Sequence, residues 1–250
     1  MARPRLGYTA EVITLAVDTS EMRGSVAVRK EGRRAAERRH ESGEDYSSWL
    51  LPAVAECLEE ARVGMAGVEL LAVCTGPGSF TGVRVGLTTV MAWAEVHGKK
   101  VVGVSRLEAM ARCAEAQEPF VAACYDAQRG QMFAAMYRRK DERLKRVEEE
   151  MVIEANSFLR MASEVAGRER IVWVTLDPEL ITCVVGWKAR AEIGDSMRRV
   201  EGDLADKIGE IAEERARKEQ FTDPLELDAN YVRRSDAEIF WKGPAAGHGR

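Results

Sequence analysis

The chain lacks the patterns that mark several common protein classes. Its five cysteines are an odd number and include no Cys-x-x-Cys pair, so we expect neither a disulfide framework nor a zinc site. It also lacks a long apolar run, because the one at Val12–Val17 is far too short for a signal peptide or a membrane span. We therefore expect a protein of the reducing cytoplasm, with no membrane partner.

An excess of basic charge is absent as well. The net charge of −4 leaves no electrostatic footprint of a protein that grips nucleic acid alone, so a partner would supply most of any RNA binding. The arginine cluster at 33–39 is interleaved with glutamates and is interpreted as a solvated strand face. By contrast, 46% of the 250 residues are hydrophobic, which excludes disorder and suffices for one large domain or two lobes.

Apolar runs, helical spacing and turn residues predict an alternation of strands and helices. Strand segments are expected at 12–18, 24–30, 33–40, 68–76, 99–105, 120–126, 131–140, 143–153 and 170–176. Helices are expected at 47–63, 82–98, 106–116, 156–166 and 202–218. This alternation is typical of an α/β fold with mixed sheets.

Two stretches of this alternation resemble each other. In each, an apolar strand ends in an aspartate (Asp18 or Asp126), and a tight turn and a glycine (Gly24 or Gly130) lead into a second strand. Two duplicated lobes facing a cleft would produce such a repeat, as in actin-like folds, where the hairpin turns offer N–H groups to nucleotide phosphate. Because aspartate and glycine are also common in ordinary turns, the repeat alone leaves duplication open.

The glycine-rich stretch CTGPGSFTGVRVG at 74–86 separates an apolar run from a helical one. It fits neither GxxxxGK[ST] nor GxGxxG, so its signal as a phosphate loop is weak. As a turn and a packing surface it fits better, because Ser79 or Thr81 can cap the helix and Gly82 and Gly86 leave one helical face bare. That face could meet the protein's own first helix or a partner helix, and the residues leave both open.

The stretch GPGSFTGVRVGL, followed by VVGVSRLEAMA, closely resembles the signature of the TsaB (YeaZ) family of bacterial proteins, which help to make threonylcarbamoyladenosine in tRNA. LAVDTS, YSSWLLPAV, YDAQRGQMFAAMY and ANYVRRSDAE agree as well, so the resemblance runs from about Leu15 to Glu238. Two positions depart from the family pattern. Tyr46 stands where a histidine is usual, and Asn230 stands where a proline is expected just before Tyr231.

The resemblance implies an actin-like (ASKHA, ribonuclease H-like) α/β fold with two duplicated mixed-sheet lobes. Residues 1–104 would form the N-terminal lobe, 105–240 the C-terminal lobe and 241–250 a flexible tail. It also implies a non-catalytic partner of TsaD, the subunit that transfers the threonylcarbamoyl group to the adenosine next to the anticodon. Such a scaffold supports the ATPase TsaE and meets tRNA only through the complex.

The family pairs with TsaD through its first two helices, and this implies a set of partner-binding residues: Trp49, Leu50, Ala53, Phe80, Gly82, Val83, Gly86, Val90 and Trp93. An apolar face rarely stays uncovered, so the free chain is expected to form a homodimer through the same helices. No intrinsic cofactor is expected, and a nucleotide only within the complex.

Vestigial nucleotide-facing residues are expected at Asp18, Thr19, Ser20, Asp126 and Arg84. The alternatives are a turn cap at Asp18 and, for Arg84, a carboxylate partner or solvent. No catalytic or metal-ligating residue is expected. A TsaD-like enzyme holds its metal through two histidines at helical spacing, and His40, His97 and His248 form no such pair.

Two rival classes of function stay open at this point. An ATP-dependent small-molecule kinase of the same fold would place Asp18 and Asp126 against bound ATP and magnesium. A metalloprotease-like protein would require a metal. Cys74 follows an apolar strand without a nearby histidine in the sequence, and we interpret it as a buried hydrophobic residue rather than a nucleophile.

Overall fold

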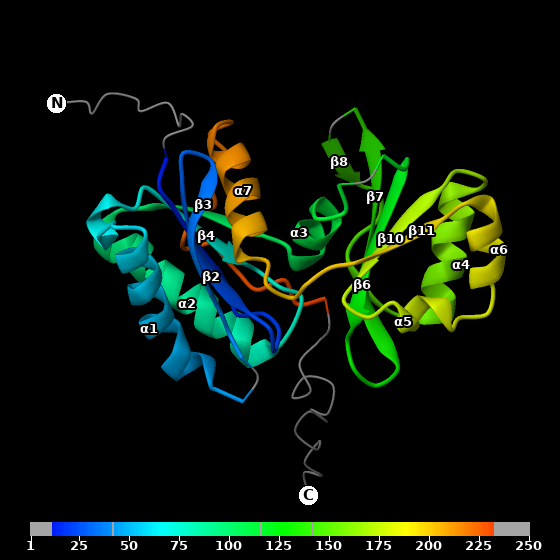
Figure 1. Ribbon diagram of the computed structural model, residues 1–250, viewed down its shortest axis with the longest axis horizontal. Coiled ribbons are helices and arrows are strands. Elements are labelled where there is room, and N and C mark those ends of the chain that lie inside the picture. Colours follow the sequence, from blue (N-terminus) through cyan, green and yellow to red (C-terminus); the bar gives the residue numbers. More distant parts are fainter. Residues whose placement is uncertain (1–11, 42, 116, 142, 233–250) are drawn as a thin grey trace, which may run out of the picture.

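The computed structural model describes residues 12–232 apart from 42, 116 and 142, and it contains two sheets with helices around them (Figure 1). The first sheet is formed by β1 (Thr14–Asp18), β2 (Ser25–Lys30), β3 (Arg33–Arg39), β4 (Leu70–Cys74) and β5 (Lys100–Val104). The second contains β6 (Phe120–Asp126), β7 (Gln131–Lys140), β8 (Arg143–Arg146), β9 (Met151–Glu154), β10 (Ile171–Thr175) and β11 (Ser196–Arg199). The α-helices are α1 (Tyr46–Glu60), α2 (Phe80–His97), α3 (Arg106–Arg112), α4 (Ala155–Ala166), α5 (Glu179–Thr182), α6 (Trp187–Ile193) and α7 (Ala205–Ala216).

The two sheets have the same topology. The first has the order β3-β2-β1-β4-β5, in which β1 is antiparallel to β2 and parallel to β4. The second has the order β8-β7-β6-β10-β11, in which β6 is antiparallel to β7 and parallel to β10. Apart from β9, which pairs with β7 outside this order, the strands of the two sheets correspond one to one, which confirms the two-lobed, duplicated α/β fold of the actin-like class.

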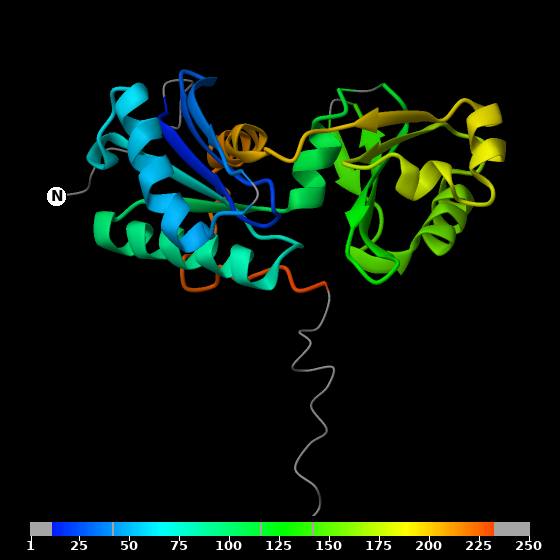
Figure 2. The ribbon, with the colours of Figure 1, turned by 60° about the horizontal axis from the view of Figure 1, so that its bottom comes forward.

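The first sheet is covered on both faces, which explains why β1 and β4 are continuous apolar runs rather than alternating ones. Leu15 and Val17 face the cluster that contains the buried side chains of α1 and α2, whereas Ala16 faces the cluster that contains Ile208 and Ala212 of α7. Figure 2 shows α1 and α2 together on one side of this sheet and α7 on the other. The two helices nearest the glycine-rich loop therefore form one layer.

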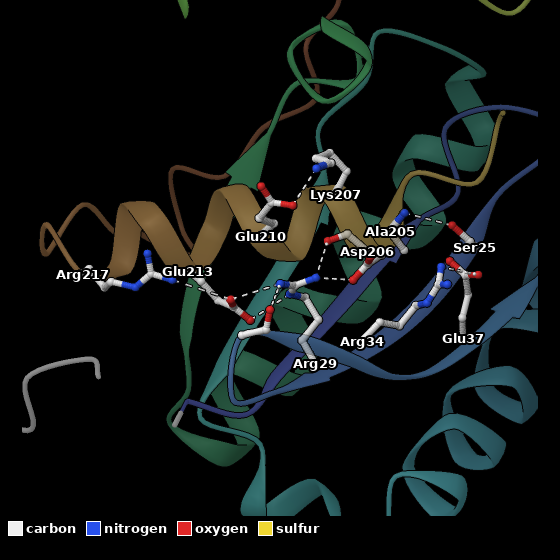
Figure 3. A network of polar contacts seen from close by, with 11 residues as sticks. Ser25, Arg29, Arg34, Glu37, Ala205, Asp206, Lys207, Glu210, Glu213 and Arg217 are labelled. Carbon is white, nitrogen blue, oxygen red and sulfur yellow. Dashed lines mark hydrogen bonds and ion pairs between the residues drawn. The ribbon is translucent and has the colours of Figure 1, made fainter. Parts of the chain in front are cut away.

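Helix α7 lies against the first sheet, although it follows the second in sequence. It contacts β1, β2, β4 and β5. Figure 3 shows how it is anchored: Arg29 of β2, which is buried, donates to Glu213 at 3.0 Å and pairs with Asp206, and Ser25 accepts from Ala205 N–H at 3.0 Å. The expected lobe boundary is therefore wrong for α7, because a buried guanidinium on β2 requires these carboxylates beside it.

Other expectations are confirmed with small differences. Helix α1 begins at Tyr46, one residue before the predicted start, and Ser79 rather than Thr81 caps α2, accepting from Gly82 N–H at 3.2 Å. The single strand predicted at 143–153 is split into β8 and β9, which both pair with β7. Helices α5 and α6 and strand β11 were not predicted. The tail at 241–250 lies outside the described residues.

Candidate functional site

The turn after β1 is both polar and buried. Asp18, Thr19 and Ser20 are all at most 2% exposed. The N–H and hydroxyl of Ser20 both donate to Asp18 Oδ1, at 3.0 and 2.6 Å. The hydroxyl of Thr19 donates to the Gly82 carbonyl at 2.7 Å, and Ser79 N–H donates to the Ser20 carbonyl at 2.7 Å. These hydrogen-bonding groups are therefore engaged within the chain rather than facing an open cleft.

Arg106, the first residue of α3, provides the counter-ion of Asp18. Its side chain is fully buried, and its Nη1 donates to Asp18 Oδ2 and lies 3.3 Å from Ser20 Oγ. Its Nη2 donates to the Gly202 carbonyl at 3.1 Å. Burial disfavours the charged guanidinium, but the surrounding negative charge, with Asp18 foremost, outweighs burial and raises the pKa of Arg106. The two side chains therefore form a buried ion pair.

This pair decides what the first turn can do chemically. Both carboxylate oxygens of Asp18 already accept hydrogen bonds, one from Ser20 and one from Arg106. A cation at the start of a helix is unfavourable for the helix dipole, and Asp18 offsets that cost. A magnesium ion at Asp18 would have to displace a buried guanidinium with the same sign of charge, so this donor set does not fit a magnesium–nucleotide site.

The matching turn of the second lobe is open. Asp126 is exposed, and it accepts from Gln128 N–H at 2.8 Å and from Gln128 Nε2 at 3.0 Å. Tyr125, one residue earlier, is buried and points toward the first lobe, where its hydroxyl donates to the Pro77 carbonyl. Its ring lies 5.4 Å from the Arg106 guanidinium. The second lobe therefore approaches the first turn through Tyr125, while Asp126 stays a solvated turn residue.

The bare face of α2 packs against the protein's own first turn. A Cβ added to Gly82 would lie 2.1 Å from the Thr19 carbonyl oxygen, and one added to Gly86 would lie 2.4 Å from Thr19 Oγ1. Both glycines are buried. The prediction of a partner helix on this face is therefore wrong, and so is the alternative of the chain's own first helix. Another segment does approach α2 closely at these two glycines, and that segment is the turn after β1.

Most of the predicted partner-binding residues belong to the chain's own interior. Six of the nine are buried within the chain and so do not form part of its exposed surface, while partner binding itself stays a prediction: Leu50, Ala53, Gly82, Val83, Gly86 and Val90. Trp49 and Trp93 are half-buried and Phe80 is 40% exposed. The outward side of the same two helices instead presents Leu51, 57% exposed, and Val96, 76% exposed.

Sequence reasoning missed Leu51 and Val96 because it followed the apolar stripe, and a stripe at helical spacing identifies the buried face of a helix. Leu51 directly follows the buried Leu50 and so falls off that face. Val96 follows Glu95 near the end of α2, where the neighbouring residues are also exposed. The sequence signal that could have identified Leu51 and Val96 is their position outside the apolar stripe, where a polar residue is usual.

Arg84 has aromatic partners rather than the anionic one considered above. Its guanidinium lies 3.7 Å from the centroid of the Phe80 ring, and its Nε donates to the Tyr231 hydroxyl at 2.8 Å. Asn230 also has a definite role, because its N–H donates to the Thr75 carbonyl at 2.8 Å. A proline, which has no N–H, could not make that bond.

The other departure from the family pattern, Tyr46, is also accounted for. Its hydroxyl donates to the Glu21 carbonyl, and its ring stacks on His40 with centroids 4.1 Å apart. Cys74 is buried, its thiol donates to Ser20 Oγ at 3.2 Å, and burial raises its pKa. That environment fits the interpretation of Cys74 as a buried hydrophobic residue rather than a nucleophile.

Two further properties concern the described part of the chain. Within residues 12–232, none of the described helices combines the length and apolar character needed to cross a membrane. In the same part of the chain, no three side chains of histidine, cysteine, aspartate or glutamate are grouped so that they could hold a metal ion.

Comparison with known proteins gives consistent matches. The model of the TsaD family, tRNA N6-adenosine threonylcarbamoyltransferase, matches residues 39–176, more than half of the chain. Bacillus subtilis (strain 168) tRNA threonylcarbamoyladenosine biosynthesis protein TsaB is 29% identical over 150 residues, which cover 60% of this chain and 66% of that protein. The Escherichia coli (strain K12) protein of the same name is 29% identical over 183 residues, or 72% of this chain and 74% of that protein.

A solved structure also matches. A Pseudomonas aeruginosa protein described as similar to the peptidase YeaZ superposes with a TM-score of 0.70 at 23% identity, covering 89% of this chain and 100% of that one. At this identity the likeness shows a common fold. Taken with the family match over residues 39–176 and the TsaB relatives, it leads to one assignment. The chain belongs to the TsaD family and, within it, to the TsaB (YeaZ) proteins.

Proposed function

We propose that this chain is a non-catalytic partner of a TsaD-type transferase and acts as a scaffold in the formation of threonylcarbamoyladenosine in tRNA. The relatives' names supply the pathway, since both TsaB proteins are biosynthesis proteins for this modification. The class of partner is inferred from the resemblance to TsaB proteins, because the TsaD family match concerns this chain itself. An adenosine nucleotide, and the ATPase TsaE, would join only in the assembled complex.

The observation that carries the non-catalytic role is the ion pair between Asp18 and Arg106. In a working kinase of this fold an aspartate at this turn would orient magnesium or water. Here Arg106 lies on Asp18 with both side chains fully buried, so the carboxylate is neutralised inside the chain. The same pair argues against the kinase alternative, which needs both Asp18 and Asp126 at bound ATP.

The surface that we assign to the partner is the outward side of α1 and α2. Its apolar members are Leu51, Val96 and Phe80, with Trp49 and Trp93 partly covered between the helices and the sheet. Exposed apolar side chains on one helical layer are typical of an interaction surface. In the absence of the partner, the same side is expected to cover itself in a homodimer, which sedimentation at increasing protein concentration would detect.

The pathway assignment is tested by depleting this protein in its own host and measuring the modified nucleoside. Threonylcarbamoyladenosine in total tRNA, measured by mass spectrometry, should fall on depletion and return when the gene is supplied in trans. The purified chain alone should release no phosphate from ATP above a blank. An unchanged level of the modified nucleoside after depletion contradicts the proposal.

The partner surface is tested with a matched pair of variants. Leu51→Asp places a charge on the outward side of α1, and Leu225→Asp makes the same change at a residue that is 87% exposed outside these helices. We expect Leu51→Asp to weaken binding to the host's TsaD-type protein about tenfold or more, as for a substituted hot spot, and Leu225→Asp to leave it unchanged. Equal binding by both variants would place the partner elsewhere.

A further inference from the structure

The ribbon formed by the end of β7 with β8 carries an unusual concentration of positive charge. Of its nine residues, Arg138–Arg146, six are basic and two are acidic, in a chain with a net charge of −4. β6 pairs with β7 up to Arg138, which faces Phe120, and Arg139 N–H donates to the Pro119 carbonyl just before β6, so the ribbon extends past the end of β6 beyond Arg139. Figure 1 shows β8 alongside the far end of β7, at the top of the second lobe.

Pairing places like charges opposite one another on this ribbon. Arg138 pairs with Lys145 and Lys140 pairs with Arg143. Side chains alternate between the two faces of a strand, so these four cations share one face. Their spacing is about 5 Å across the ribbon and about 7 Å along it. All four are exposed, whereas Arg139 and Leu144, on the other face, are half-buried.

Within the described part of the chain, three of these cations have no carboxylate partner: Lys140, Arg143 and Lys145. Arg138 has one long carboxylate contact, 3.6 Å to the exposed Glu169, and its guanidinium lies 5.4 Å from the centroid of the Phe120 ring. Like charges directly opposite one another destabilise a strand pair, so the fold gains nothing from this arrangement.

The other arginine-rich strand, β3, behaves differently. Arg34 and Arg39 pair with Glu37, Arg39 also pairs with Asp203, and Arg38 pairs with Glu56 and Glu60. Its charges are largely neutralised within the chain, in agreement with the interpretation of β3 as a solvated face. By contrast, the cations of the ribbon are largely not neutralised by carboxylates of the described chain, so they are available to bind an external anion.

We propose that the β7–β8 ribbon is a contact for the phosphate backbone of RNA, made by this chain itself within the complex. The inference rests on the proposed function, a role in tRNA modification, which makes tRNA the expected polyanion. It amends the expectation that the chain meets tRNA only through its partner. Exposed lysine and arginine side chains on a protruding ribbon bind phosphates without reading bases, which suits recognition of tRNA by its backbone.

The test measures binding of a fluorescently labelled tRNA transcript to the purified full chain by anisotropy, at several salt concentrations. The ribbon variant is K140E/R143E/K145E, with K140Q/R143Q/K145Q as a milder second variant. The matched control R33E/R160E/K218E makes the same change of charge at exposed cations on β3, α4 and the segment after α7. Circular dichroism melts verify that each variant is folded.

We expect the ribbon variant to bind tRNA about tenfold or more weakly than the control variant at low salt. The slope of log K against log salt should fall by about 2 units, since about 0.7 to 0.9 of a unit is lost per phosphate contact. Equal binding by the ribbon and control variants overturns the inference, as does binding to vesicles containing anionic phospholipid but not to tRNA. Either result leaves the depletion test of the proposed function unaffected, so the two can fail separately.

Discussion

The two aspartate-led turns occupy equivalent places in the duplicated topology, yet their environments are opposite. The turn after β1 is buried, and its aspartate is paired with Arg106. The turn after β6 leaves Asp126 exposed, where it accepts hydrogen bonds from Gln128. The common strand order shows that duplication has kept the backbone. The difference teaches that equivalent turns can differ in chemistry, because the first aspartate lies against a buried guanidinium and the second is exposed.

The largest expected effect concerns Arg106→Leu. Removing one partner of a buried ion pair leaves Asp18 as an uncompensated buried charge, which typically costs about 3–5 kcal/mol. We expect the free energy of unfolding, measured by urea titration, to fall by that amount. The corresponding change in the open turn, Asp126→Asn, should alter it by about 0.5 kcal/mol or less.

A double variant sharpens this result. Asp18→Asn combined with Arg106→Leu removes both charges, so it should be more stable than Arg106→Leu alone. If Arg106→Leu unfolds at the same urea concentration as the wild type, the ion pair does not stabilise the fold. The non-catalytic role proposed for the first lobe then loses its main support.

The second prediction concerns how tightly α2 lies on the first turn. A leucine at position 86 would start from a Cβ only 2.4 Å from Thr19 Oγ1, and overpacking of this kind costs about 1–3 kcal/mol or more. We expect Gly86→Leu to lower the melting temperature clearly, whereas Thr88→Leu, at an exposed position of the same helix, should not. A Gly86→Leu variant that melts normally but loses its partner would restore the partner-helix interpretation.

The third prediction compares the matching glycines of the two turns. A Cβ on Gly24 would lie 2.3 Å from the Tyr46 hydroxyl and 2.4 Å from the Asp18 carbonyl, whereas one on Gly130 meets nothing within 4 Å. Gly24→Ala should therefore cost about 1–3 kcal/mol. Gly130→Ala should cost about 1 kcal/mol, because its φ of +72° disfavours any side chain. Equal losses in thermal melts would mean that the two turns are equally packed.

The sequence alone predicted the long helices and most of the strands of both lobes, because their apolar periodicity and turn residues agree with one another. It missed α5 and α6, which have 4 and 7 residues, because such short helices hardly establish a period. It predicted a close approach at Gly82 and Gly86 but not its second member. A glycine indicates that another segment approaches closely, but it does not identify that segment. Here the segment contains Thr19, which is 63 residues from Gly82.

Arg106 was beyond sequence reasoning for a related reason. Its position after Ser105, the cap of α3, is an ordinary one for any residue, and nothing local indicates a carboxylate. The pairing depends on where α3 lies relative to β1, 88 residues earlier in the chain. Local patterns therefore predicted the elements, while the decisive contact of the site is a property of the tertiary fold.

The smallest expected effect concerns a second buried carboxylate, Glu150, which contrasts with Asp18 in its partners. Its side chain is 2% exposed and accepts from Ser105 at 2.5 Å and from Asn230, but its nearest guanidinium, on Arg146, is 3.6 Å away and partly exposed. Burial raises the pKa of Glu150, and the neutral donors only partly oppose this shift.

A raised pKa in the folded state means that Glu150 contributes most to stability below its unfolded pKa, and that this contribution is lost as the pH rises through the folded value. Glu150→Gln removes the titration, and the Ser105 hydroxyl can turn to accept from the new amide while Asn230 still donates to its oxygen. Compared with the wild type, the variant should therefore gain in melting temperature as the pH rises from about 4 toward 7. Asp126→Asn, which removes an exposed carboxylate, is the control variant. If instead the wild type gains in melting temperature relative to Glu150→Gln over this pH interval, the hydrogen bonds to the Glu150 carboxylate outweigh its burial.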